Sequence, residues 1–480
     1  MKKIFKIYIL FFVFIILSCI IFIQNVQANE NENIESENIS NEKENIESEN
    51  ISNEVQIIYK NEKIKKLNDN NTETKLQISQ NTEIKIKSDK IIGSLYIKYE
   101  KFSKPGYLKV GENQYKLGEN GFLHEYIEIK EQSYDKEIIL NYNENVQISE
   151  IYCFTKGDVP KWVQKWKLQK GEVDLMLFST HSDDEHLFFA GLIPLYISKG
   201  LNLQVVYLTN HNETPGRLHE QLDGLWSVGN SNYPIIGKFP DAFSESLEGA
   251  IKNLKTAGYT TDDILQFQVE QIRKYRPLVV VGHDENGEYK HGQHILNTHI
   301  LKQSIVKSED ENYDERTVKE YGLWQSPKLY IHLLKQNPIE LDFDKKLDYF
   351  DGKTAYEMSK IGYSYHKSQQ YTWFTKWLNG QNNIFNSAKQ IKTYNPTNYG
   401  LYYTSVGLDI EKNDMFENIN KSNFRNNSNT EKNVLNNQKE VKKIEIFKNR
   451  IFYIVIGIFI SIILLCIVIL IRKKTIAKSS

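Results

Sequence analysis

Cysteine is scarce in this sequence, with three residues among 480. Cys19 and Cys466 lie in strongly apolar runs near the two ends, so Cys153 is alone in the polar region between them. A single cysteine cannot form a disulfide within that region, and it cannot supply a cysteine-based zinc site. The region between the apolar runs must therefore fold on its hydrophobic core alone.

The chain also lacks an excess of either charge. Lysine and arginine number 60 and aspartate and glutamate 61, which gives a formal net charge of −1 at pH 7. Proteins that bind nucleic acids normally carry a clear basic excess, so the charge gives no reason to expect a nucleic-acid partner. The length suggests roughly two or three domains.

Long apolar runs stand at the two ends. Basic residues precede the first run and small residues around Ala28 follow it, an order typical of a secretory signal peptide over 1–28. An uncleaved N-terminal anchor is the alternative. Residues 451–471 are apolar over the length that a helix needs to cross a bilayer, and a basic tail, 472–480, follows. We therefore expect a single-pass cell-membrane protein with a C-terminal transmembrane helix, an extracellular body and a cytoplasmic tail.

Composition divides the chain between these runs. Residues 29–55 repeat the acidic motif ENIESENISNE, and residues 409–450 are rich in asparagine. Neither segment can bury enough apolar surface to fold, so we expect a spacer and a stalk. Over 56–160, short runs such as TEIKIKS and EYIEIK alternate with period two between turn residues, which predicts a β-sandwich domain. From 171 to 408 strands alternate with helices, the pattern of a parallel α/β sheet.

Two histidine-rich clusters follow strands of this second region. The clusters are THSDDEH and GHDENGEYKHGQH. Ligands of parallel α/β sheets bind at the carboxyl ends of the strands, where both clusters are expected to lie. The expected strands are 173–180, 203–210 and 277–284, and the expected helices are 184–200, 217–229 and 262–275.

The clusters contain the residue types of a catalytic metal site. His291 and His294, three residues apart, share one face of a helical turn. With His181 and a carboxylate they can supply three protein ligands and leave positions open for water, as in catalytic zinc sites. The adjacent Asp183 and Asp184 cannot both face one ion, so one is expected to bind the metal and the other to act as a base. Their alternative role is to cap a helix N-terminus.

These motifs resemble those of the PIG-L/LmbE family of zinc-dependent N-acetylglucosaminyl de-N-acetylases, which is typified by HPDDE and a later H-x-x-H. The resemblance covers about 171–305 and extends more weakly to about 408. It implies a Rossmann-like, parallel-sheet deacetylase domain. It also implies that Zn²⁺, or another divalent metal, is bound by His181, Asp184 and His294.

The resemblance further implies roles for residues around the metal. Asp183 is the expected general base, and His291 is expected to stabilise the oxyanion or to protonate the departing amine. Arg217 and Asp241 follow neighbouring strands where the family contacts sugar, so both are expected to bind substrate. A position on the surface of a helix is the alternative for Arg217.

The resulting hypothesis is a metal-dependent deacetylase that hydrolyses the N-acetyl amide of N-acetylglucosamine units in an extracellular or cell-surface glycan. The alternative is a non-catalytic, membrane-anchored glycan-binding protein that uses the hydrolase fold as a scaffold. The joint presence of Asp183 and His291 favours the enzyme, because a scaffold needs neither. Two positions depart from the family pattern: Ser182 replaces proline, and Lys290 stands where glycine is common. Lys290 bears on the shape of the pocket rather than on the metal.

Overall fold

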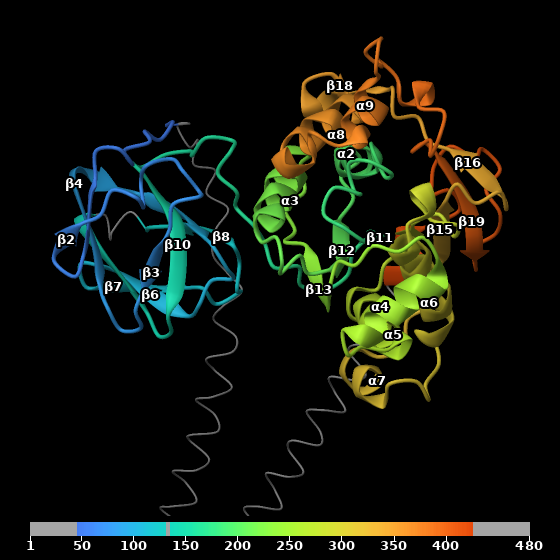
Figure 1. Cartoon of the computed structure of the whole chain (residues 1–480), viewed down its shortest axis with the longest axis horizontal. Coiled ribbons are helices and arrows are strands. Elements are labelled where there is room, and N and C mark those ends of the chain that lie inside the picture. The colour runs from blue at the N-terminus through green and yellow to red at the C-terminus, as the bar shows by residue number, and fades with distance from the viewer. Residues whose placement is uncertain (1–45, 131–134, 426–480) are drawn as a thin grey trace, which may run out of the picture.

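The computed structural model describes residues 46–130 and 135–425 (Figure 1). Within these ranges, no helix combines the length and the apolar composition needed to cross a membrane. The predicted signal peptide, 1–28, and the predicted transmembrane helix, 451–471, lie outside the described residues. The predicted fold class included a C-terminal transmembrane helix. This part of the prediction is corrected, because the described residues contain no helix of that kind.

The N-terminal part is built from two antiparallel sheets that enclose a core rich in isoleucine and leucine. In β4, Ile84 and Ile86 are buried and Lys87 is exposed, the alternation expected of a strand with one solvated face. Within the described residues, one sheet contains, in order, β2 (Glu62–Lys63), β1 (Gln56–Tyr59), β4 (Ile84–Ile92), β9 (Asp135–Tyr142), β6 (Gly106–Val110) and β7 (Asn113–Leu117). The other contains β3 (Leu76–Ile78), β10 (Val146–Phe154), β5 (Ser94–Tyr99) and β8 (His124–Glu128).

The second part is organised around a mixed sheet, not the wholly parallel one that the sequence predicts. Its inner strands are parallel and almost completely buried, but β19 runs antiparallel to both of its neighbours. The chain comes back to the sheet in the opposite direction, so β19 does not need the crossover that a parallel strand requires. β19 is also partly exposed. In the described part of the chain the strand order is β13 (Ile235–Phe239), β12 (Leu203–Thr209), β11 (Leu175–Ser179), β14 (Val279–Gly282), β15 (Lys328–His332), β19 (Asn398–Thr404) and β16 (Pro338–Glu340).

Helices cover both faces of this sheet (Figure 1). Leu175 and Leu177 of β11 belong to the core cluster on one face, whereas Met176 and Phe178 belong to the cluster on the other. The first face packs against α2 (Leu192–Ser198), α3 (Gly216–Ser227) and α8 (Ala355–Ser364), with α9 (Trp373–Asn379) beyond. The second face packs against α5 (Thr261–Tyr275) and α6 (Gly292–Lys307), flanked by α4 (Leu247–Thr256) and α7 (Glu315–Tyr321).

The helix predicted over 184–200 is much shorter in the structure. Regular helix begins only at Leu192, after Gly191 with φ 90°. A Cβ at Gly191 would lie 2.4 Å from the ring of Phe343, so only glycine fits this bend. The preceding residues form buried turns that hold the side chains of the THSDDEH cluster around the strand end.

The described parts of the two segments assigned by sequence to the spacer and the stalk pack on the folded body. Ile51 is completely buried in the sandwich core, and its N–H donates to the carbonyl of Cys153. Met415 is buried in the core of the second part, and Asp409 pairs with the buried Lys328. The ordered body therefore extends beyond 56–160 and 171–408.

The two parts contact each other through β8 and α3 (Figure 1). His124 Nε2 lies 2.8 Å from His219 Nδ1 of α3. Next to this contact, the ring of Phe122 stacks on that of Tyr233 with 4.1 Å between centroids. The sandwich thus packs directly against a helix that also borders the candidate site.

Candidate active site

The three predicted metal ligands converge at the carboxyl end of β11. Asp184 Oδ2 lies 3.3 Å from both His181 Nδ1 and His294 Nε2, and these two nitrogens are 3.1 Å apart. In tetrahedral zinc sites with bonds of about 2.0–2.1 Å, neighbouring ligand atoms are about 3.3 Å apart. All three side chains are buried. The donor set and its spacing therefore fit one divalent metal ion such as Zn²⁺.

Glu288 orients one of these ligands, and sequence reasoning missed it. Its Oε2 lies 2.7 Å from His294 Nδ1 and 2.9 Å from His283 Nδ1, while Oε1 lies 2.6 Å from His332 Nδ1. Burial alone raises the pKa of this carboxyl, but the histidines hold it well below its usual range. An ionised Glu288 keeps the proton of His294 on Nδ1, so that Nε2 presents its lone pair to the metal.

Gln293 orients the second histidine in a similar way. His181 Nε2 lies 3.0 Å from Gln293 Oε1, which leaves Nδ1 facing Asp184 and His294. The Gln293 oxygen also accepts the N–H of Ala242 at 3.0 Å. The only sequence signal for Gln293 was its position inside the second cluster.

His283 lies next to the metal ligands but is poorly placed to be one. Its Nε2 lies 3.5 Å from Asp184 Oδ2, yet the N–H of Thr180 already donates to this nitrogen at 3.1 Å. Its other nitrogen faces Glu288. With both nitrogens engaged, His283 supports the site rather than completing it.

Asp183 has the environment of a base with a raised pKa. It is buried and adopts φ 115°, which is unfavourable for a residue with a side chain. Burial raises the pKa of Asp183 to about 7, against the opposing charge of Arg217 and with a further contribution from Asp184. A carboxyl poised near neutrality can both accept and return a proton.

Arg217 and Asp241 line a cavity, and Arg217 connects this cavity to the carboxyl of Asp183. Arg217 Nη2 lies 3.3 Å from Asp183 Oδ2, and Nη1 lies 3.3 Å from Asp241 Oδ2. Asp241 Oδ1 is also 3.4 Å from His181 Nε2. The cavity has a volume of about 540 Å³, and Glu73 of the sandwich contributes to its lining. Arg217 is thus no simple surface residue of a helix.

His291 lies beside the metal ligands, with ring centroids 4.5 Å from His181 and 4.7 Å from His294. It caps α6: its Nδ1 accepts the N–H of Gln293 at 3.2 Å. Burial lowers the pKa of His291 far below its ordinary value. A neutral ring whose Nδ1 is an acceptor carries its proton on Nε2, where it can donate to a developing oxyanion.

Ser182, which replaces the usual proline, makes contacts that proline cannot make. Its N–H donates to His211 Nε2 at 2.9 Å, and its hydroxyl donates to the carbonyl of Arg217 at 2.9 Å. The guanidinium of Arg217 donates in return to the carbonyl of Ser182 at 2.6 Å. The departure from the family pattern therefore ties the first cluster to the start of α3. Lys290, the second departure, has φ 63° and is the last residue of the short 3₁₀ helix Glu288–Lys290.

Residues 176–305 match the protein-family model described as PIG-L: GlcNAc-PI de-N-acetylase. The chain carries a PIG-L family domain. This confirms the resemblance inferred from the two motifs. The matched range contains every predicted ligand and every predicted catalytic residue, although it assigns no role to any of them.

Curated relatives of this domain are named as amidases and deacetylases. The chain is 28% identical over 182 residues to mycothiol S-conjugate amidase of Streptomyces coelicolor, covering 34% of this chain and 61% of that protein. It is 25% identical over 200 residues to a 1D-myo-inositol 2-acetamido-2-deoxy-α-D-glucopyranoside deacetylase of Rhodococcus opacus, covering 37% of this chain and 67% of that protein. The chain thus matches about three fifths to two thirds of the length of these relatives.

Solved structures give more distant likenesses. The N,N′-diacetylchitobiose deacetylase of Pyrococcus horikoshii is 14% identical, with 48% of this chain and 83% of that chain covered and a TM-score of 0.34. A pectin-binding carbohydrate-binding module is 18% identical, with 20% of this chain and 82% of that chain covered and a TM-score of 0.17.

Proposed function

We propose that this protein is a metal-dependent deacetylase that hydrolyses the N-acetyl amide of N-acetylglucosamine units in a glycan. The observation that carries the proposal is the triangle of His181, Asp184 and His294 with the buried carboxyl of Asp183 beside it. The PIG-L match over the same residues supports it. His181, Asp184 and His294 would hold a divalent metal, which we propose to be Zn²⁺, and the bound ion would supply acidification of a water molecule and polarisation of the acetyl carbonyl.

The chain's own groups carry the proton transfers in the proposed reaction. Asp183 accepts a proton from the attacking water as the water oxygen bonds to the acetyl carbon. His291 donates a hydrogen bond from Nε2–H to the carbonyl oxygen as negative charge develops there, and it keeps its proton. When the carbon–nitrogen bond breaks, Asp183 returns its proton to the amine. The products are acetate and a free amino sugar.

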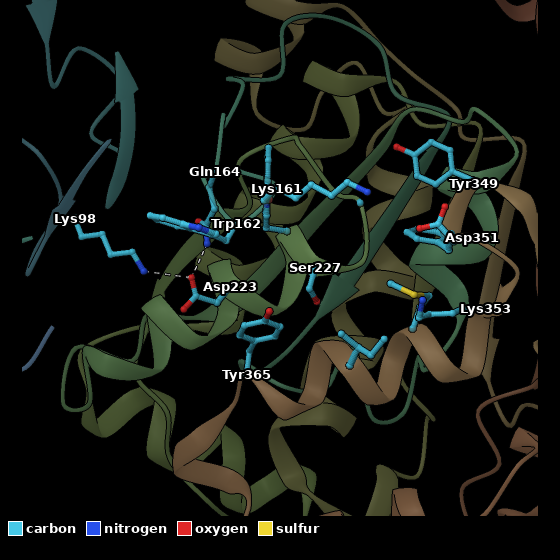
Figure 2. Close-up of a pocket in the computed structure, with 15 residues that line it drawn as sticks. Lys98, Lys161, Trp162, Gln164, Asp223, Ser227, Tyr349, Asp351, Lys353 and Tyr365 are labelled. Atoms are coloured by element: carbon cyan, nitrogen blue, oxygen red, sulfur yellow. Dashed lines mark hydrogen bonds and ion pairs between the residues drawn. The ribbon is translucent and has the colours of Figure 1, made fainter. Parts of the chain in front are cut away.

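A second cavity supports a substrate of several sugar units. It lies between the sandwich and the second domain, has a volume of about 790 Å³, and is bordered by the exposed rings of Trp162, Tyr349 and Tyr365 (Figure 2). Aromatic rings with polar neighbours are a common lining for small polar ligands. The Lys98–Asp223 ion pair at 3.7 Å closes the sandwich side of this cavity (Figure 2).

Helix α3 connects the two cavities. Arg217 and Glu220 line the first cavity, whereas Asp223 and Ser227 line the second. Spacings of three and four residues put all four side chains along one face of the helix. A glycan whose acetamido group reaches Asp183 can therefore extend along α3 toward the aromatic rings. We also propose, from the pattern at 1–28, that the body acts on such glycans outside the cell.

The test is acetate release by the full chain from N-acetylglucosamine oligomers of one to five units. We expect kcat/KM to rise with chain length, because remote units supply binding energy that positions the scissile amide. Release should cease in the Asp183→Asn variant and after metal removal. Wild-type protein that binds these oligomers without releasing acetate would favour the glycan-binding scaffold instead. A profile that is highest for the monosaccharide would exclude the polymeric substrate.

A further inference from the structure

A second group of metal-ligating side chains lies behind the candidate active site. Glu185 and His186 directly follow the two aspartates of the first cluster, and His366 follows the end of α8. One donor atom from each side chain lies within 4.8 Å of the other two. All three side chains are buried, with exposed fractions of 0 or 1%. None of them takes part in the proposed deacetylation.

Five polar atoms of this group form no well-aligned hydrogen bond among the described residues, although Glu185 and His366 are close enough to form an ion pair. These atoms are Oε1 of Glu185 and both ring nitrogens of His186 and of His366. The other oxygen of Glu185 accepts the N–H of Asp183 at 2.9 Å, so the carboxylate is fixed with Oε1 facing the histidines. Buried polar groups nearly always have well-aligned hydrogen bonds, and so many buried atoms without one in one place point to a missing ligand.

The separations between these atoms match the edges of a metal coordination sphere. Glu185 Oε1 lies 3.2 Å from His366 Nε2 and 3.5 Å from His186 Nε2. Tetrahedral zinc with bonds of about 2.0–2.1 Å places its ligand atoms about 3.3 Å apart. These two distances are close to the 3.1–3.3 Å edges of the His181, Asp184 and His294 triangle, and a nitrogen of each histidine lies within 4.8 Å of the other.

Two glycines border the space beside both histidines. A Cβ at Gly224 of α3 would lie 2.8 Å from His186 Nε2 and 3.0 Å from His366 Nε2. A Cβ at Gly362 of α8 would lie 2.4 Å from His186 Cε1. Any larger residue at these positions would therefore press on the nitrogen atoms that face the carboxylate.

We propose that Glu185, His186 and His366 bind a second divalent metal ion with a structural role. Two imidazoles and a carboxylate are a donor set that favours Zn²⁺ over Mg²⁺ or Ca²⁺. The buried Tyr207 hydroxyl, within hydrogen-bonding reach of Glu185, is a further oxygen at this place. The ion joins the loop of Asp183 to the end of α8, two segments far apart in the sequence. It thereby holds the strained loop that carries the base.

The experiment is a count of zinc ions per chain, measured by elemental analysis on the full protein after loading with Zn²⁺ and removal of free metal. We expect two ions in the wild type. His366→Gln and His294→Ala should each retain one, and the double variant none. His299→Ala, at an exposed histidine of α6, is the control and should retain two. Two ions in a folded His366→Gln variant would overturn the proposal, as would a single wild-type ion that His294→Ala removes.

A second measurement covers the case in which His366→Gln does not fold. Anomalous diffraction from zinc-loaded wild-type crystals should give one peak at His294 and a separate peak between His186 and His366. A peak at His294 alone would overturn the second site while leaving the proposed deacetylase intact. A peak at the second site alone would contradict the catalytic ligand set and support this inference, because the readout does not depend on activity.

Discussion

Arg217 contacts Asp183 through Nη2, 3.3 Å from the carboxylate, and reaches Asp241 at the same distance through Nη1. The guanidinium therefore connects the proposed base to the cavity in which we expect the sugar. A residue predicted only as a substrate contact also controls the charge state of the base. This double role gives Arg217 an effect on pH dependence that a simple sugar contact would lack.

Replacing Arg217 by glutamine should move the acid limb of the kcat/KM profile to higher pH. Burial raises the pKa of Asp183 and Arg217 lowers it, so loss of the guanidinium raises this pKa further. The base must be ionised to act, so activity should fall at a higher pH, by about one unit or more. Arg316→Gln, at an exposed arginine of α7, is the control. An unchanged acid limb would mean that Asp183 is not the base.

Replacing His294 by alanine should remove the catalytic metal ion with little change in fold. The imidazole supplies one of three protein ligands, and its loss leaves two. Metal content by elemental analysis should fall by one ion per chain, and activity should fall at least about 100-fold. Full metal content in this variant would show that the ligands are assigned wrongly.

The two adjacent aspartates should respond differently to conversion to asparagine. Asp183→Asn should abolish acetate release while the metal stays bound, because only the base is lost. Asp184→Asn should reduce both, because Oδ2 contacts both histidines of the triangle. Metal affinity of both variants, measured by competition with a chromogenic chelator, separates the roles. Equal loss of metal in the two would favour a site that they share.

Replacing Glu288 by glutamine should weaken metal binding although Glu288 is no ligand. The carboxylate accepts from His294 and orients its ring, and loss of such a partner typically costs about 10–100-fold in metal affinity. Chelator competition measures this change. Glu285→Gln, at an acidic residue paired with Lys302, is the matched control and should bind metal as the wild type does. Wild-type affinity in the Glu288 variant would assign it a purely structural role.

Stability should fall as pH rises through the range in which Glu150 ionises. Burial, together with the neighbouring Asp69, raises the pKa of Glu150 from 4.5 to about 7. Because the folded-state pKa is the higher one, the stabilising contribution is complete below about 4.5 and is lost as pH approaches 7. Glu150→Gln should therefore flatten the decrease in melting temperature between pH 4.5 and 7. An unchanged slope would assign that decrease to other groups.

The strands and clusters that define the site can be predicted from the local sequence pattern, whereas the pairing of the edge strand β19 cannot. β11, β12 and β14 are runs of buried apolar residues that read directly as parallel strands, and the clusters follow two of them. β19 pairs antiparallel with β15, and the paired residues are more than sixty positions apart in the sequence. The half-exposed pattern of β19 is compatible with either strand direction. Sheet direction at that edge depends on the path of the intervening chain, which no short window contains.

The supporting residues of the site were hidden for a similar reason. Glu288 lies in the second cluster but looks like one acidic residue among several, and only the fold brings His332 and His283 to it. His366 stands about 180 residues from Glu185, so no spacing rule links them. The late start of α2 depended on the contact between Gly191 and Phe343, again a long-range packing effect.

Phe122 and Leu123 of the sandwich belong to the hydrophobic core of the PIG-L domain, and the backbone N–H of Leu123 donates to the Tyr233 hydroxyl at 3.0 Å. Such an arrangement differs from that of a binding module tethered by a linker, which can be exchanged between enzymes. Here a change on one side of the boundary must be matched on the other. The two parts therefore make one structural unit, and we expect neither to tolerate exchange of the other for an unrelated module.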